Sequence, residues 1–151
     1  MHLTHYIGLS HRSHAALAEA WSKIAEGHCD EPDVKLLARR FATATGDHAR
    51  RHEAFVRSES ADTPPPENFE AWTFRGPRAG GLGLLRDLHE MSLLVSECDI
   101  ACMLLTVGAQ GVRDADLLEL ARSGQAETKR QLDWLHSRMK QAAPQALVVA
   151  Q

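Results

Sequence analysis

Residues 82–110 read LGLLRDLHEMSLLVSECDIACMLLTVGAQ and decide the fold. Apolar side chains recur in this stretch every three or four residues, which is the spacing of one face of an α-helix. The positions expected to face inward are Leu84, Leu88, Met91, Val95, Cys98, Cys102, Leu105 and Ala109. The ten residues 100–109 carry no charge, so the helix is apolar all round. One bundle covers only part of such a helix, and either the rest of the chain or a second subunit must cover the remainder.

Three further segments show the same helical spacing, and none of comparable length alternates at period two. The four helices are expected at about 4–28, 31–57, 82–110 and 114–142. The first two and the last two are separated by only a few residues, which predicts two antiparallel hairpins. The prediction is an all-α chain: a four-helix bundle of two antiparallel hairpins joined by a long crossover, in one domain that spans residues 1–151.

The crossover is residues 58–81, which hold four of the six prolines and the aromatic residues Phe69, Trp72 and Phe74. A disordered linker rarely carries three aromatic side chains, so we expect an ordered strap that lies on the bundle. We also expect four local signals at the helix ends. They are N-caps at Thr4 and Asp114, a tight turn at Gly111 and a stop at Pro144.

Composition excludes several classes of protein. The 151 residues carry a net charge of −3, which supplies no basic surface for nucleic acid. Three cysteines are too few for a disulfide scaffold, and no secretory signal is evident, so we expect a cytoplasmic protein. The uncharged run 100–109 is too short for a membrane span of about 20 residues, so we expect no membrane partner. The apolar helix 82–110 instead predicts a homo-oligomer.

Nine histidines are the unusual feature of the composition. His48 and His52 are four residues apart, which places both imidazoles on one helix face. His14 lies 17 residues before a turn near Glu31, and His48 lies 17 residues after it, so the two are expected at the same level of the bundle. His11 falls opposite Arg51 or His52 in the same register. A simpler interpretation is that these are hydrogen-bonded core histidines and solvated edge residues.

Carboxylates on the last two helices form a second group. Glu97 and Glu127 each lie 15 residues from a turn near Val112, and Asp99 borders the same level. If the strap crosses the bundle, Glu97 and His48 also come to one level. The metal ligands predicted from this register are His14, His48, His52, Glu97 and Glu127, with His11 and Asp99 as outer candidates and iron or zinc as the ion. Salt bridges are the simpler interpretation of the carboxylates. Cys98 and Cys102 are also four residues apart and could bind a soft metal or sense oxidants, but apolar packing is the favoured interpretation.

Two hairpins with a long middle connection resemble the ferritin-like family of four-helix bundles. That resemblance implies iron oxidation or storage at a Glu-x-x-His site. No glutamate here is followed three residues later by histidine, and the nearest equivalent is Asp133-x-x-His136. The pair His48-x-x-x-His52 is similar to one ligand pair of the hemerythrin-like oxygen carriers, whose accompanying His-x-x-x-Glu is missing.

Three functions remain open from the sequence. The first is a non-enzymatic association or scaffold module with structural histidines. The alternative is a transition-metal-binding bundle with redox or oxygen-related chemistry. The third is a pocket for a small apolar ligand beneath residues 58–81, with Trp72 and Phe69 as its lid. No nucleophile and base pair and no phosphate-binding loop appears, so enzyme activity stays undecided.

Overall fold

The computed structural model describes residues 2–58 and 66–149, and within these ranges the chain is all-α with no strand. The helices are α1 (Leu3–Gly27), α2 (Pro32–Ser58), α3 (Gly80–Val112) and α4 (Ala115–Pro144), followed by a π-helical turn, η1 (Gln145–Val149). The expectation of four long helices is confirmed, with every boundary within two residues of its predicted place.

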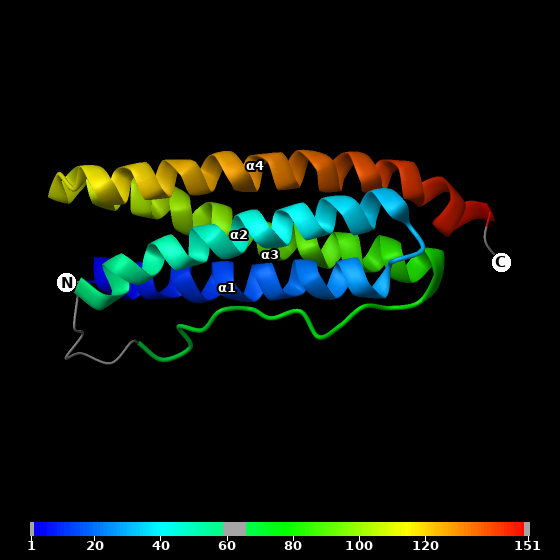
Figure 1. Cartoon of the computed structure of the whole chain (residues 1–151), viewed down its shortest axis with the longest axis horizontal. Helices are drawn as coiled ribbons and strands as arrows, with labels where there is room; N and C mark the ends of the chain where they lie inside the picture. Colours follow the sequence, from blue (N-terminus) through cyan, green and yellow to red (C-terminus); the bar gives the residue numbers. More distant parts are fainter. Residues whose placement is uncertain (1, 59–65, 150–151) are drawn as a thin grey trace.

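The long connection runs the length of the bundle. Figure 1 shows α1 beside α2 and α3 beside α4, while the segment 66–79 passes along the outside from the end of α2 to the start of α3 at the opposite end. Phe74 is buried, and the ring of Phe69 lies 5.2 Å from that of Tyr6. Trp72 is 63% exposed. Two of the three aromatic side chains therefore fasten the strap, and the third faces solvent. The expected proline run includes Pro64 and Pro65, which lie outside the described residues.

The turn between α3 and α4 differs from its expected chemistry. Gly111 lies inside α3, and the left-handed residue that ends the helix is Arg113, at φ 57°. The backbone N–H of Asp114 bonds to the carbonyl of Ala109, which satisfies one of the last carbonyls of α3. The Asp114 side chain then accepts a hydrogen bond from Leu117 N at 3.0 Å, so the predicted N-cap at this position is confirmed.

The expected signals at Thr4 and Pro144 were wrong. α1 already begins at Leu3, and the residue before it, His2, makes no side-chain capping bond. α4 includes Pro144, and the chain continues into η1. Proline has a helical φ, so it can occupy the last position of a helix, where it removes one backbone hydrogen bond and its ring crowds the carbonyl four residues before it.

The core consists of two apolar clusters. The larger one surrounds Trp21, Leu88 and Met91, and the smaller one surrounds Ile7 and Leu105. Along α1 the residue His14 lies between members of the two clusters, as do Cys102 on α3 and Gly124 on α4. A layer of polar and small side chains therefore crosses the bundle between its two apolar regions.

A chain of buried hydrogen bonds borders this layer. Trp21 donates its indole N–H to Gln131 Oε1 at 2.8 Å, and Gln131 donates from Nε2 to Thr45 Oγ1 at 2.9 Å. The chain joins α1, α4 and α2. We expect Gln131→Ala to lower the free energy of unfolding by about 1–3 kcal/mol, because it leaves the buried indole N–H without a partner. Chemical denaturation measures this loss, and Lys129→Ala on the exposed face of α4 is the matched control. Equal losses in both variants would contradict the role given to the chain.

α3 has a second apolar face that the described chain leaves exposed. Leu93, Ile100, Leu104 and Val107 are each 40% exposed or more. By length and composition alone α3 is apolar enough to cross a membrane, although the core helix of a soluble protein passes the same test. The opposite face of α3 lies in the core of the bundle, against α1 and α4.

Candidate metal centre

Three buried histidines from two helices form a compact group. His14 comes from α1, and His48 and His52 come from α2. Their ring centroids are 4.6 Å apart for His14 and His48, 5.1 Å for His14 and His52, and 4.8 Å for His48 and His52. One ring nitrogen from each lies within 4.8 Å of the others. The equal spacing of His14 and His48 from the turn between α1 and α2 accounts for this meeting.

Backbone hydrogen bonds fix the tautomers of two of these rings. His14 donates from Nδ1 to the carbonyl of Ser10 at 2.7 Å, and His52 donates from Nδ1 to the carbonyl of His48 at 3.0 Å. Each Nε2 is then unprotonated and can accept a hydrogen bond or bind a cation. Ligating histidines in metal proteins are held in the same way, with the other ring nitrogen bonded to a carbonyl or carboxylate. In this structure the Ser10 hydroxyl donates to His52 Nε2 at 2.9 Å.

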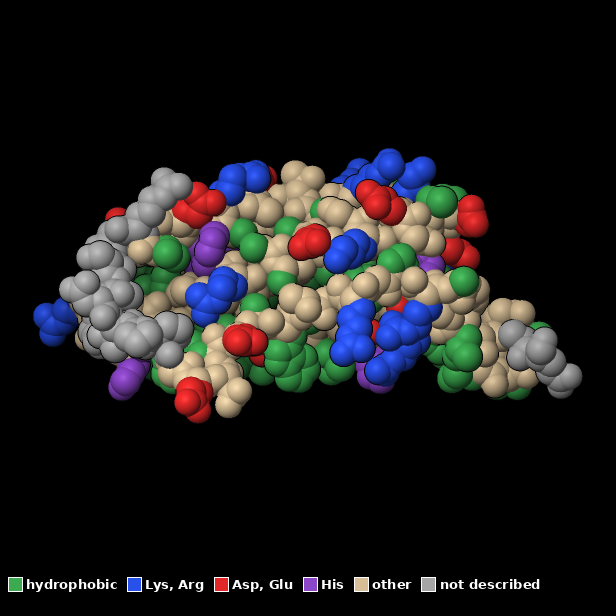
Figure 2. Space-filling view, turned by 90° about the horizontal axis from the view of Figure 1, so that it is seen from below, with side chains coloured by type: hydrophobic (Ala, Val, Ile, Leu, Met, Phe, Trp, Pro, Cys, Tyr) green, Lys and Arg blue, Asp and Glu red, His purple; other side chains and the backbone are tan. Residues whose placement is uncertain are grey.

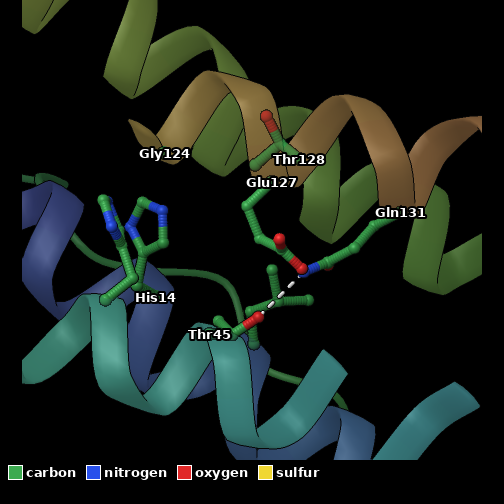
Figure 3. A pocket seen from close by; sticks show the side chains of 8 residues that line it. His14, Thr45, Gly124, Glu127, Thr128 and Gln131 are labelled. Carbon is green, nitrogen blue, oxygen red and sulfur yellow. Dashed lines mark hydrogen bonds between the residues drawn. The ribbon is translucent and has the colours of Figure 1, made fainter. Parts of the chain in front are cut away.

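The third ring presents a nitrogen that has no partner among the described residues. His48 Nε2 is buried and makes no hydrogen bond within residues 2–58 and 66–149. An unpaired buried polar atom costs about 1–3 kcal/mol, so its position calls for an explanation. The crevice beside it, between α1, α2 and α4, is too narrow to hold a water molecule. Figure 3 shows Gly124 of α4 next to the imidazoles at one end of this crevice.

α3 supplies a thiol at the same place. Cys102 Sγ lies 3.8 Å from His14 Nε2. A Cβ added at Gly124 would lie 2.5 Å from Cys102 Sγ and 2.6 Å from His48 Nε2, so the thiol and the unpaired nitrogen border one small space. Three imidazoles and one thiol, from three helices, therefore lie close together, and the absence of a side chain at Gly124 lets the thiol and His48 Nε2 approach α4.

Burial keeps all four groups uncharged. With a smaller contribution from neighbouring imidazoles, it lowers the pKa of His14 to about 4, of His48 to about 3 and of His52 to about 4. Burial also raises the pKa of the Cys102 thiol to about 12. The imidazoles are thus neutral near pH 7, as metal ligands must be, whereas the thiol would lose its proton only when a cation binds.

The predicted carboxylates lie elsewhere. Glu127 lines the same crevice, but it accepts hydrogen bonds from Arg130 and Gln131, and Figure 3 shows it towards the end where Thr45 lies. Asp99 accepts a hydrogen bond from Thr128 at 2.6 Å. Glu97 lies on α3 next to Cys98, outside both the histidine group and the crevice lining. The carboxylates therefore reach the expected level of the bundle without joining the histidines.

The outer candidate His11 lies at the edge of the group. Its ring centroid is 6.5 Å from that of His52, and its Nδ1 donates to the carbonyl of Ala49 at 2.9 Å. Cys102 is absent from the predicted ligand set, because the sequence favoured apolar packing for it over binding of a soft metal. Its place on the inward stripe, one turn after Cys98, is the signal that locates it. Only the rotation of α3 about its axis decides that it faces His14.

Gly124 gives a direct test of the space at this centre. We expect Gly124→Ala to cost about 1–3 kcal/mol, because the new methyl group overlaps Cys102 Sγ and His48 Nε2. Gly111→Ala is the control, since a Cβ there meets nothing within 4 Å and removes a helix-weakening glycine. Thermal or chemical unfolding compares the two variants. A Gly124→Ala protein as stable as the Gly111→Ala protein would show that Cys102 and His48 do not approach Gly124 this closely.

No family model, curated protein or solved structure matches this chain. The function is therefore inferred from the geometry of the site.

Proposed function

We propose that this protein binds one transition-metal ion through His14, His48, His52 and Cys102. The observation that carries the proposal is the buried, unpaired Nε2 of His48, which lies in a space too narrow for water and shared with a thiol. A metal–nitrogen bond of about 2.0–2.1 Å needs less room than a hydrogen-bonded water. A bound cation would satisfy His48 Nε2 and would replace the hydrogen bonds that His52 Nε2 and His14 Nε2 accept from Ser10 and Cys102.

The ligand types favour zinc. Tetrahedral sites with imidazole and thiolate ligands suit Zn²⁺, whereas non-haem iron sites use a carboxylate beside two histidines. Glu97, Glu127 and Asp99 lie outside the histidine group, so the set is poor for iron. In a tetrahedral zinc site the ligand atoms are about 3.3 Å apart. The nitrogens, now within 4.8 Å, would move inward by small side-chain rotations, and the Ser10 hydroxyl would turn away from His52.

The surroundings support a structural or sensing ion over a catalytic one. Catalytic zinc sites keep one ligand position open to water or substrate, and structural sites are closed. Four protein ligands, two of which line a crevice without room for water, would leave no open position. The ion would tie α1 and α2 to α3 across the polar layer of the core. The proposed function combines the two alternatives from the sequence: the protein would be a non-enzymatic module, and it would bind a transition metal.

The layout supports a ferritin-like arrangement. The pairs α1–α2 and α3–α4 would be its two antiparallel hairpins, and the strap would be its crossover. Within this proposal the metal centre differs from the family pattern, because histidines and a cysteine would replace the carboxylates. The centre would also lie between two hairpins, so an ion would hold the hairpins together.

The first experiment is metal analysis of protein purified without a histidine tag. We expect close to one equivalent of zinc per chain, or uptake of one equivalent after removal of metal and dialysis against Zn²⁺. Because binding stabilises the folded state, we also expect a rise in the melting temperature with added Zn²⁺. A protein that takes up no metal at one equivalent and melts unchanged would overturn the proposal.

We further propose self-association through the exposed face of α3. Leu93, Ile100 and Val107 are spaced seven residues apart, so they form one stripe along the helix, and each is 46% exposed or more. Light scattering at micromolar concentration should therefore give the mass of a dimer. Ile100→Lys should shift the mass to that of a monomer, because it places a charge in the stripe, whereas Lys129→Ala should not. A monomeric mass for the unaltered protein would contradict this part of the proposal.

A further inference from the structure

A second cavity lies between the strap and the first half of α3, far in the sequence from the metal ligands. Its volume is about 320 Å³, at the lower end of the range for small-molecule sites. The residues that define its chemistry are Trp72, Arg75, Arg78, Arg86, Glu90 and Leu93. Figure 2 shows the strap side of the molecule, where a cluster of Lys and Arg side chains lies beside hydrophobic ones.

Some of the charged side chains that line this cavity form ion pairs, and others do not. Arg78 bonds to Asp87 at 2.6 Å and to Glu90 at 3.0 Å, and Asp87 also accepts from His28. Arg75 and Arg86 have no acidic partner within the described ranges 2–58 and 66–149. Arg75 of the strap and Arg86 of α3 thus bring two guanidinium groups without a carboxylate partner to the cavity, and Arg86 donates to His89 Nδ1 at 3.2 Å. Such groups bind phosphate and carboxylate in a bidentate manner.

The lining of the cavity also includes accessible apolar side chains. Trp72 is 63% exposed and makes no ring contact within the described chain, and Leu93 is 46% exposed. A free indole face in a cavity binds flat rings by stacking. The cavity therefore offers a charged part for an anion and a flat part for an aromatic ring. The sequence predicted an apolar ligand under a lid of Trp72 and Phe69, but Phe69 lies against Tyr6 and does not line the cavity.

We propose that this cavity binds a mononucleotide or a closely similar small anion that carries a flat heteroaromatic ring. Arg75 and Arg86 contact the anionic group, and the ring stacks on Trp72. Arg78 holds the wall in place through Asp87 and Glu90. The site is independent of the metal centre, because it shares no residue with it.

The test is isothermal titration calorimetry of the whole protein with AMP, GMP, CMP and UMP, followed by the same titrations with adenosine and inorganic phosphate. We expect at least one nucleotide to bind with one-to-one stoichiometry, at least tenfold more tightly than either adenosine or phosphate alone. Binding should weaken as salt concentration rises, because ion pairs with phosphate are screened. Quenching of tryptophan fluorescence gives a second readout of stacking.

Substitutions distinguish a specific nucleotide site from nonspecific binding to basic side chains on the surface. We expect the double variant Arg75→Ala/Arg86→Ala to weaken nucleotide binding at least tenfold and Trp72→Ala to weaken it about tenfold. Arg122→Ala, at an exposed position of α4, is the matched control and should change it less than twofold. Absence of saturable binding for all four nucleotides would overturn the proposal. So would phosphate binding as tight as nucleotide binding, or equal affinity in the Trp72→Ala and unaltered proteins.

Discussion

Replacing His48 by alanine is expected to lower the affinity of the protein for Zn²⁺ by at least a hundredfold. Loss of a residue that merely orients a metal ligand costs ten- to a hundredfold, and loss of a ligand costs at least as much. His48 also contributes the unpaired nitrogen that the ion would satisfy. Competition with a chromophoric chelator of known zinc affinity measures the change.

The matched control is His136→Ala, at an exposed position of α4 outside the centre. It should keep the affinity of the unaltered protein. His48→Gln keeps most of the side-chain volume, so it distinguishes the loss of a ligand from the loss of packing. Circular dichroism of both His48 variants without metal checks that they fold. Equal zinc affinity in the His48→Gln and His136→Ala proteins would show that His48 is not a ligand.

The metal-free protein is expected to lose about 4 kcal/mol of stability between pH 7.5 and pH 5.5. The pKa values of His14, His48 and His52 are lowered from 6.5 to about 4, 3 and 4 in the folded protein. The unfolded chain therefore binds protons first, at a pH where the native state stays neutral. Each histidine contributes about 1.4 kcal/mol over this interval, and the stability it provides is present above pH 6.5 and lost below it.

Denaturation at the two pH values measures this loss. His52→Gln should reduce it by about a third, because glutamine does not titrate, and His136→Ala should leave it unchanged. Excess Zn²⁺ should enlarge the difference between the two pH values, because protons compete with the ion for the imidazoles. Coincident unfolding curves at pH 7.5 and pH 5.5 for the metal-free protein would contradict the buried, neutral state of the three rings.

The helices were predictable because each buries one face, and burial leaves a regular spacing in the sequence. The stripe from Leu84 to Ala109 is buried as predicted. The helix ends were less predictable, since several residue types can hydrogen-bond to the free backbone N–H and C=O groups at the end of a helix. Asp114 caps α4, but Arg113 takes the left-handed position in place of the nearby Gly111.

The sequence predicted the level of each site residue along the bundle axis, but it did not predict the direction in which each side chain points from its helix. Counting residues from a short turn gives the level of a side chain, which brought His14 and His48 together correctly. The direction in which the side chain points depends on how each helix is rotated. That rotation turns Cys102 towards His14, and it leaves Glu127 beside Arg130 and Gln131.

The central claim is that three histidines and a cysteine from three helices bind one ion. Titration with Co²⁺ followed by visible and near-ultraviolet absorption tests it most directly, because cobalt replaces zinc in tetrahedral sites and reports its ligands. The account predicts saturation at one equivalent, tetrahedral d–d bands and an intense thiolate-to-cobalt charge-transfer band. Cys102→Ser should abolish the charge-transfer band, and Cys29→Ser, at an exposed position, should keep it. No absorption change at one equivalent, or a charge-transfer band unchanged in Cys102→Ser, would contradict the account.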